Sequence, residues 1–239
     1  MEEYVRRAID RGLVLFGFSD HTPYTYPGGY SSHSKMSVDE MGVYFAEGER
    51  LREKYGDYIE IPMGFEAEYY PAYWENLLTE YRKYPVEYLL YAGHHIGNEP
   101  DSFSAFDETS DPGRLTAYVD HSISALETGR FTAIAHPDCL NFTGDEELYR
   151  AEMTRLILAA KRLDIPMEIN MHGKRSGKNY PCSAFWEEAA RLGATACFGM
   201  DCHLPEHVAD PTEIYEIERF AERYKLNVIE KLTLIDPLK

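Results

Sequence analysis

The chain has 239 residues, of which 44% are hydrophobic and 27% are charged, as in ordinary globular proteins. Its 24 Lys and Arg residues against 41 Asp and Glu residues give a net charge of −17, which disfavours a nucleic acid partner. No run of 18 or more apolar residues occurs, so we expect no membrane-spanning helix and no membrane partner. A small molecule is the expected partner.

The cysteines and the first residues bear on location. Residues 1–7 are charged and predict a helix instead of a secretory signal. The four cysteines show neither a CxxC spacing nor the density of a disulfide framework, which favours reduced thiols and a cytoplasmic location. They are Cys139, Cys182, Cys197 and Cys202.

Six apolar, β-rich runs alternate along the chain with longer helical patterns. This alternation predicts βα units that build a parallel sheet. Helix-start signals agree, because Ser37 and Glu40 form a capping-box pattern and Asp111 precedes a proline. No linker or low-complexity segment interrupts the series, so residues 1–239 are expected to form one domain. The runs are 13–18, 58–65, 86–92, 131–135, 166–169 and 194–199.

Each run ends in His, Asp, Glu or Asn. The carboxyl ends of the strands of an α/β barrel meet at one face, which holds the active site, so these side chains are expected to converge. Residues i and i+2 of a strand point to the same side, so Asp201 and His203 can enter one site while Cys202 faces away. The ends are Ser19-Asp20-His21, Glu66-Ala67-Glu68, His94-His95, His136-Pro137-Asp138, Asn170-Met171-His172 and Asp201-Cys202-His203.

These residue types indicate a metal centre. Imidazole nitrogens together with carboxylates suit zinc, iron or manganese. A carboxylate can bridge two ions, so Glu66 and Asp201 among several histidines favour a multinuclear site. Two ions roughly 3.5–4 Å apart can clamp both oxygens of an in-line displacement, which suits phosphoester hydrolysis.

Four motifs resemble those of the PHP family: residues 18–23 (FSDHTP), 64–69 (GFEAEY), 135–138 (AHPD) and 199–208 (GMDCHLPEHV). Within that family they are most similar to histidinol-phosphate phosphatases of the PHP type, and they occur in order over nearly the whole chain. The resemblance implies an α/β fold, a distorted (β/α)7 barrel similar to a TIM barrel. It also implies up to three divalent ions, zinc, iron or manganese, at the C-terminal face.

The resemblance further implies which residues bind the ions. Glu66 takes the place of the bridging carboxylate and would hold a central ion with His95 and His136, His95 being preferred over its neighbour His94. A first ion would share Glu66 and take Asp201. A third ion would take His21 and His203. The implied ligand set is His21, Glu66, His95, His136, Asp201 and His203.

The implied reaction is hydrolysis of L-histidinol phosphate to L-histidinol and phosphate in histidine biosynthesis. Arg175, with Lys174 beside it, is expected to hold the phosphate. Asp20, Asp138 or a water could protonate the leaving alkoxide, and the sequence does not choose among them. The alternatives are a phosphatase of another small metabolite and a metal-binding protein with little activity. Further residues expected near the substrate are Asn170 and His172.

One feature departs from the family pattern. PHP proteins begin with a His-x-His pair at the end of a first strand, and no such pair precedes His21. The helix expected over residues 2–11 resembles the one that follows that strand. We therefore expect a barrel that lacks its first strand, with six parallel strands and only two protein ligands each for the first and third ions.

Overall fold

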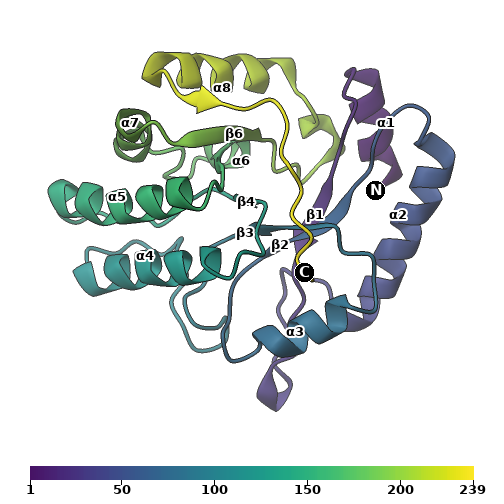
Figure 1. The fold of residues 1–239 in the computed structure, drawn as a ribbon, viewed down its shortest axis with the longest axis horizontal. Coiled ribbons are helices and arrows are strands. Elements are labelled where there is room, and N and C mark those ends of the chain that lie inside the picture. Colours follow the sequence, from purple (N-terminus) through teal and green to yellow (C-terminus); the bar gives the residue numbers. More distant parts are fainter.

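Seven parallel strands form one sheet in the computed structural model, which describes residues 1–239 (Figure 1). Each strand pairs with the next along the chain, in the order β1 to β7, and the sheet is not closed. The right-handed βα crossovers of such a series place the connecting helices on the outer face of the curved sheet. The strands are β1 (Phe18–His21), β2 (Met63–Ala67), β3 (Tyr88–Tyr91), β4 (Ala133–Ile134), β5 (Met167–Asn170), β6 (Thr195–Gly199) and β7 (Asn227–Val228).

All six predicted strands are present, and the predicted α/β fold is confirmed. The number of strands was wrong by one, because β7 has only two residues and carries no periodic pattern. The first strand also begins later than predicted, at Phe18. A Cβ on Gly17 would lie 2.5 Å from the hydroxyl oxygen of Tyr88, which donates to the carbonyl of Phe18. Glycine is therefore needed where the chain enters β1.

The helices begin where their capping residues predict. Asp111 accepts from the backbone N–H of Gly113, and Glu40 accepts from the backbone N–H of Ser37. Satisfying these otherwise unpaired donors stabilises a helix start by roughly 0.5–2 kcal/mol. The α-helices are α1 (Glu2–Asp10), α2 (Met41–Tyr55), α3 (Trp74–Tyr81), α4 (Pro112–Leu126), α5 (Glu146–Arg162), α6 (Met171–Arg175), α7 (Ser183–Leu192) and α8 (Pro211–Tyr224). Short 3₁₀ helices lie at Pro27–Gly29, Val38–Glu40 and Pro205–His207.

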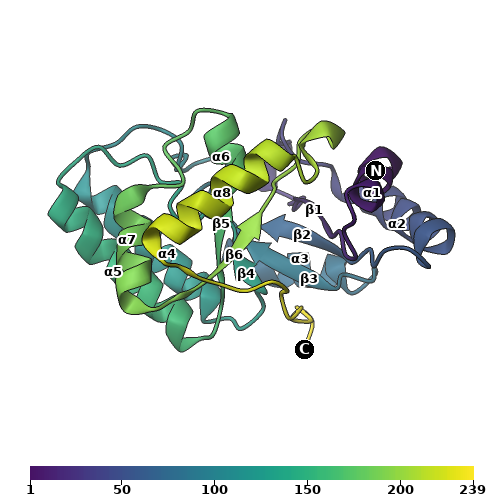
Figure 2. The ribbon, with the colours of Figure 1, turned by 90° about the horizontal axis from the view of Figure 1, so that it is seen from above.

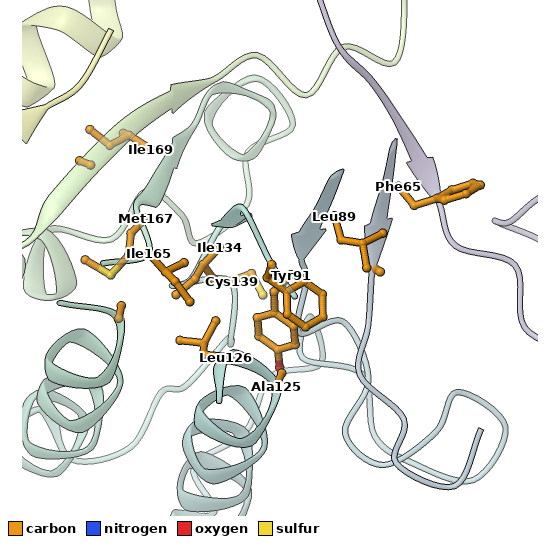
Figure 3. Packing of buried hydrophobic residues seen from close by; sticks show 14 of the residues in the cluster. Phe65, Leu89, Tyr91, Ala125, Leu126, Ile134, Cys139, Ile165, Met167 and Ile169 are labelled. Atoms are coloured by element: carbon orange, nitrogen blue, oxygen red, sulfur yellow. The ribbon is translucent and has the colours of Figure 1, made fainter. Parts of the chain in front are cut away.

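The main core lies between the sheet and the row of helices α4, α5 and α7. Leu126 of α4 lies beneath Ile134 and Ile165 in the close view (Figure 3), and these side chains belong to one cluster of 47 buried residues. Helices α1 and α2 lie at the β1 edge, away from α5 and α7 (Figure 2). No helix is both long and apolar enough to cross a lipid bilayer.

The open side of the sheet borders a cavity. Its volume is about 1080 Å³, and Phe16, Phe18 and Phe198 are among its apolar walls. Several of the polar strand ends also line this cavity, including Glu66 and Asp201. The incomplete closure expected from the sequence is thus present, and it leaves the strand ends open to small molecules.

Candidate metal centre

The parallel register places His21 beside Glu66 at the ends of β1 and β2. Nδ1 of His21 lies 3.0 Å from Oε2 of Glu66. Burial opposes a proton on His21, but the neighbouring carboxylate of Glu66 outweighs burial and raises the pKa of the ring to about 9. This position therefore attracts positive charge.

Two more histidines reach the other oxygen of the same carboxylate. Nε2 of His136 lies 2.8 Å from Oε1 of Glu66, and Nε2 of His94 lies 3.5 Å from it. The two ring nitrogens are only 3.1 Å apart. Burial opposes ionisation of Glu66, yet its histidine neighbours lower its pKa well below the usual range. Three imidazoles thus converge on one ionised, buried carboxylate, and we call His21, Glu66, His94 and His136 the central group.

The structure places His94 in this group in place of the preferred His95. The backbone of His95 pairs with Ser104 in an isolated antiparallel bridge beyond the end of β3. Neighbouring side chains point to opposite sides of such a segment, so His94 turns inward and His95 does not. Nδ1 of His94 also meets Oε1 of Glu68 at 3.1 Å, which fixes the ring.

A second group forms at the ends of β5 and β6. His172, Asp201 and His203 each offer a ligand atom within 4.8 Å of the others. The rings of His172 and His203 stack with centroids 4.1 Å apart, and Nδ1 of His203 lies 3.3 Å from Oδ1 of Asp201. The structure therefore groups the residues differently from the family assignment, which paired His21 with His203. His172, expected at the substrate, joins Asp201 and His203, so this group has three candidate ligands instead of two.

Backbone strain occurs in both groups. His136 has φ 28° and Asp201 has φ 45°, in the left-handed region that residues other than glycine rarely adopt. Such strain costs of order 1–3 kcal/mol per residue and is concentrated at functional sites. The fold maintains these conformations at two of the residues expected to bind metal.

A buried carboxyl group that the sequence reasoning missed lies between the two groups. Oε2 of Glu168 accepts from the backbone N–H of His136 at 2.9 Å and from Nδ2 of Asn170 at 3.0 Å. Burial raises the pKa of Glu168 to about 7. A Cβ on Gly199 would lie 1.5 Å from Oε1 of Glu168, so only glycine fits opposite it. The signal in the sequence was a glutamate inside an otherwise apolar run.

Asn170 links the two groups through its side-chain amide. Its Nδ2 donates to Oδ2 of Asp201 at 3.1 Å as well as to Glu168, and its Oδ1 accepts from the backbone N–H of Gly173. The residue is 1% exposed. Asn170 also lines the cavity, so its expected contact with substrate stays a prediction, while its amide group holds Asp201 in place.

Arg175 and Lys174 have other partners than the expected phosphate. Arg175 forms two contacts with Glu213 of α8, Nε to Oε1 at 2.7 Å and Nη2 to Oε2 at 2.9 Å. It also donates to the carbonyl oxygen of Met200 at 3.1 Å. Lys174 lies 2.7 Å from Glu216 of the same helix. Both side chains thus connect α6 to α8, and Arg175 secures the segment that leads to Asp201.

The two candidate proton donors lie in different surroundings. Asp138 is 1% exposed, and its Oδ2 accepts from the backbone N–H of Cys182 at 2.5 Å and from Nε1 of Trp186 at 3.0 Å. Burial raises its pKa to about 6. These contacts direct Asp138 toward α7 and away from the open side. Asp20 is exposed and lines the cavity beside His21.

Lys178 is a free cation near the central group that the sequence reasoning did not single out. Its Nζ lies 4.6 Å from the centre of the Phe106 ring, and no carboxylate pairs with it. The Phe106 ring lies 5.5 Å from the ring of His94. An exposed ammonium group without a partner is available to an anionic substrate.

Comparison with known proteins identifies the family of this chain. A model of the PHP domain matches residues 1–172. A probable histidinol-phosphatase of Deinococcus radiodurans is 24% identical over 212 residues, covering 86% of this chain and 81% of that protein. One of Schizosaccharomyces pombe is 27% identical over 233 residues, covering 87% and 76%. A histidinol phosphate phosphatase of Lactococcus lactis, solved with zinc, L-histidinol and phosphate, has a similar fold, with TM-score 0.72, 18% identity and coverage of 100% and 91%.

Proposed function

Because the chain belongs to the PHP domain family, we propose that it is a metal-dependent phosphomonoesterase that hydrolyses L-histidinol phosphate to L-histidinol and phosphate. The observation that carries this proposal is the convergence of three imidazoles on the carboxylate of Glu66. The two relatives named as histidinol-phosphatases support the choice of substrate and of a role in histidine biosynthesis.

The donor set fits divalent metal ions. Nε2 of His94 and Nε2 of His136 face each other at 3.1 Å beside an ionised carboxylate, which is the arrangement a bound cation stabilises. The central group would hold one ion, and His172, Asp201 and His203 would hold another. Bound zinc, iron or manganese would supply Lewis acidity toward water and the phosphoryl oxygens.

The remaining polar residues have separate tasks. Lys178 can contact the phosphate as an unpaired cation, since Arg175 is already bound to Glu213. Asn170 and Glu168 hold the strand ends that carry Asp201 and His136. We assign protonation of the leaving alkoxide to Asp20 or to water, because Asp138 is enclosed against α7.

The test is phosphate release by the purified chain loaded separately with zinc, iron(II) or manganese. A panel of small phosphate monoesters separates the proposed substrate from other metabolites. We expect histidinol phosphate to have the highest kcat/KM, by about tenfold or more, since one well-placed polar contact changes transition-state binding by roughly that factor. No release above an EDTA-treated control, or a better substrate in the panel, would contradict the proposal.

A further inference from the structure

A buried chain of charges lies behind the central group. Nζ of Lys35 lies 2.7 Å from Oε1 of Glu68 and 3.1 Å from Oε2 of Glu99. The three side chains are 4%, 1% and 8% exposed, respectively. Burying charges is costly unless they are paired, so each member depends on the others. None of the three is among the candidate metal ligands.

The chain of charges continues to a candidate ligand. Oε1 of Glu68, which accepts from Lys35, also lies 3.1 Å from Nδ1 of His94. A carboxylate can only accept, so Nδ1 carries the hydrogen and Nε2 keeps its lone pair. That lone pair faces Glu66 and His136, as metal binding requires.

The side-chain contacts of the Glu68 carboxylate are made through one of its two oxygens, Oε1. Its other oxygen, Oε2, is buried and has no hydrogen-bond partner. Oε1 is therefore held by Lys35 on one side and serves His94 on the other. If the ammonium group were removed, the carboxylate would keep only its contact with the ring of His94, the group that it orients.

Lys35 comes from a segment of the chain that covers this side of the site. Within residues 24–36, Tyr24 donates to the carbonyl oxygen of Glu68 at 2.7 Å, and Tyr30 donates to Oε1 of Glu99 at 3.0 Å. The segment is thus attached at both carboxylate-bearing residues. Lys35 is the one cation that connects it to the ring of His94.

We propose that Lys35 is a positioning residue, which orients His94 through Glu68 and thereby sets the affinity of the central group for a divalent ion. The proposal rests on the metal centre of the proposed function and is independent of the substrate. Glu99 provides the internal contrast, because it contacts Lys35 but not Glu68 or His94. Its loss should leave the path from Lys35 to His94 intact.

The experiment measures zinc affinity of the full chain by competition with a chromophoric chelator, without substrate. Lys35→Met should weaken zinc binding by about 10–100-fold, the usual effect of removing a group that orients a ligating histidine. Lys35→Arg should restore part of that loss, and Glu99→Gln should stay within about threefold of the parent. Circular dichroism of the metal-free chains reports whether each variant is folded.

The double variant Lys35→Met with Glu99→Gln removes one charge of each sign, so it avoids leaving two buried carboxylates unpaired. It should still lose zinc affinity. Zinc binding within about threefold of the parent in a folded Lys35→Met or double variant would overturn the proposal. An equal loss of zinc affinity in Glu99→Gln would also overturn the proposal. The buried charges would then affect zinc binding by holding residues 24–36 in place, and not through the path from Lys35 to His94.

The unaltered chain gives an independent test that does not depend on the folding of a variant. Nitrogen-15 NMR of the zinc-loaded protein identifies which ring nitrogen of His94 carries hydrogen. We expect the hydrogen on Nδ1 and zinc on Nε2, and the reverse would overturn the proposal. Neither the zinc affinity nor the NMR experiment depends on hydrolysis, so both can be interpreted even if the proposed activity is absent.

Discussion

The carboxylate of Glu66 and the ring of His136 meet at 2.8 Å although 70 residues separate them along the chain. They meet because β2 and β4 flank β3 in a parallel sheet, whose strands all end at the same edge. Glu66 also contacts His21 and His94, so one carboxylate unites residues from three other strand ends. The metal centre therefore depends on Glu66 more than on any single histidine.

Glu66→Gln keeps the size of the side chain and removes its charge. We expect the metal content to fall to less than half and kcat/KM to fall by at least about 100-fold, since losing a ligand exceeds the roughly 10–100-fold effect of losing a supporting partner. Elemental analysis and phosphate release check this. The control is Glu218→Gln on the exposed face of α8. Full metal content and activity in Glu66→Gln would contradict the assignment.

His94→Asn and His95→Asn distinguish the two adjacent histidines. The His94 variant should lose bound metal, because its Nε2 lies within 3.5 Å of Glu66. The His95 variant should keep metal content and kcat/KM within about threefold of the parent, as expected for a residue that neither binds the metal nor orients a metal ligand. Measured side by side, a larger loss of metal in the His95 variant would mean that the chain turns differently after β3.

The strand ends could be predicted from the sequence. Which of the two adjacent histidines, His94 or His95, points toward the central group could not. Buried strands are short apolar runs, and their polar ends stand out. His94 and His95 follow β3 in an irregular segment, where the bridge between His95 and Ser104 decides which ring turns inward. This pairing is an isolated bridge outside the strands, so no alternation of polar and apolar residues in the sequence predicts it.

Arg175 illustrates a second kind of limit. Its guanidinium group binds Glu213, which lies 38 residues further along the chain. A basic residue in a loop suggests a phosphate contact, and only the placement of α8 against α6 reveals the competing carboxylate. Lys178 lies three residues further along the chain, and of the three cations Lys174, Arg175 and Lys178 it is the one that forms no ion pair.

Lys178→Met tests the proposed phosphate contact. We expect KM for histidinol phosphate to rise roughly 3–10-fold, the effect of losing one charge-assisted hydrogen bond at a solvent-accessible site. The kcat value and metal content should stay close to those of the parent. Lys174→Met is the matched control, because Lys174 pairs with Glu216 and points toward α8. Equal effects of both changes on KM would remove Lys178 from the site.

Asp138→Asn should change how stability depends on pH. Burial raises the pKa of Asp138 from 3.8 to about 6, so the folded chain favours the protonated form. Below pH 3.8 the group is protonated in both states and costs nothing. As pH rises from about 4 to 6, the unfolded chain ionises first, and the parent loses about 3 kcal/mol of stability through this group. Above pH 6 the loss is constant.

Asparagine does not titrate in this range, and its Oδ1 can still accept from Cys182 and Trp186 as the Oδ2 of Asp138 does. The free energy of unfolding of Asp138→Asn minus that of the parent should therefore rise by about 3 kcal/mol between pH 4 and pH 6 and then level off. Urea unfolding of both metal-free chains at several pH values measures the difference, in which the other titrating groups cancel. A difference that does not vary with pH would mean that burial does not favour the protonated form of Asp138, and would return this residue to the candidates for proton transfer.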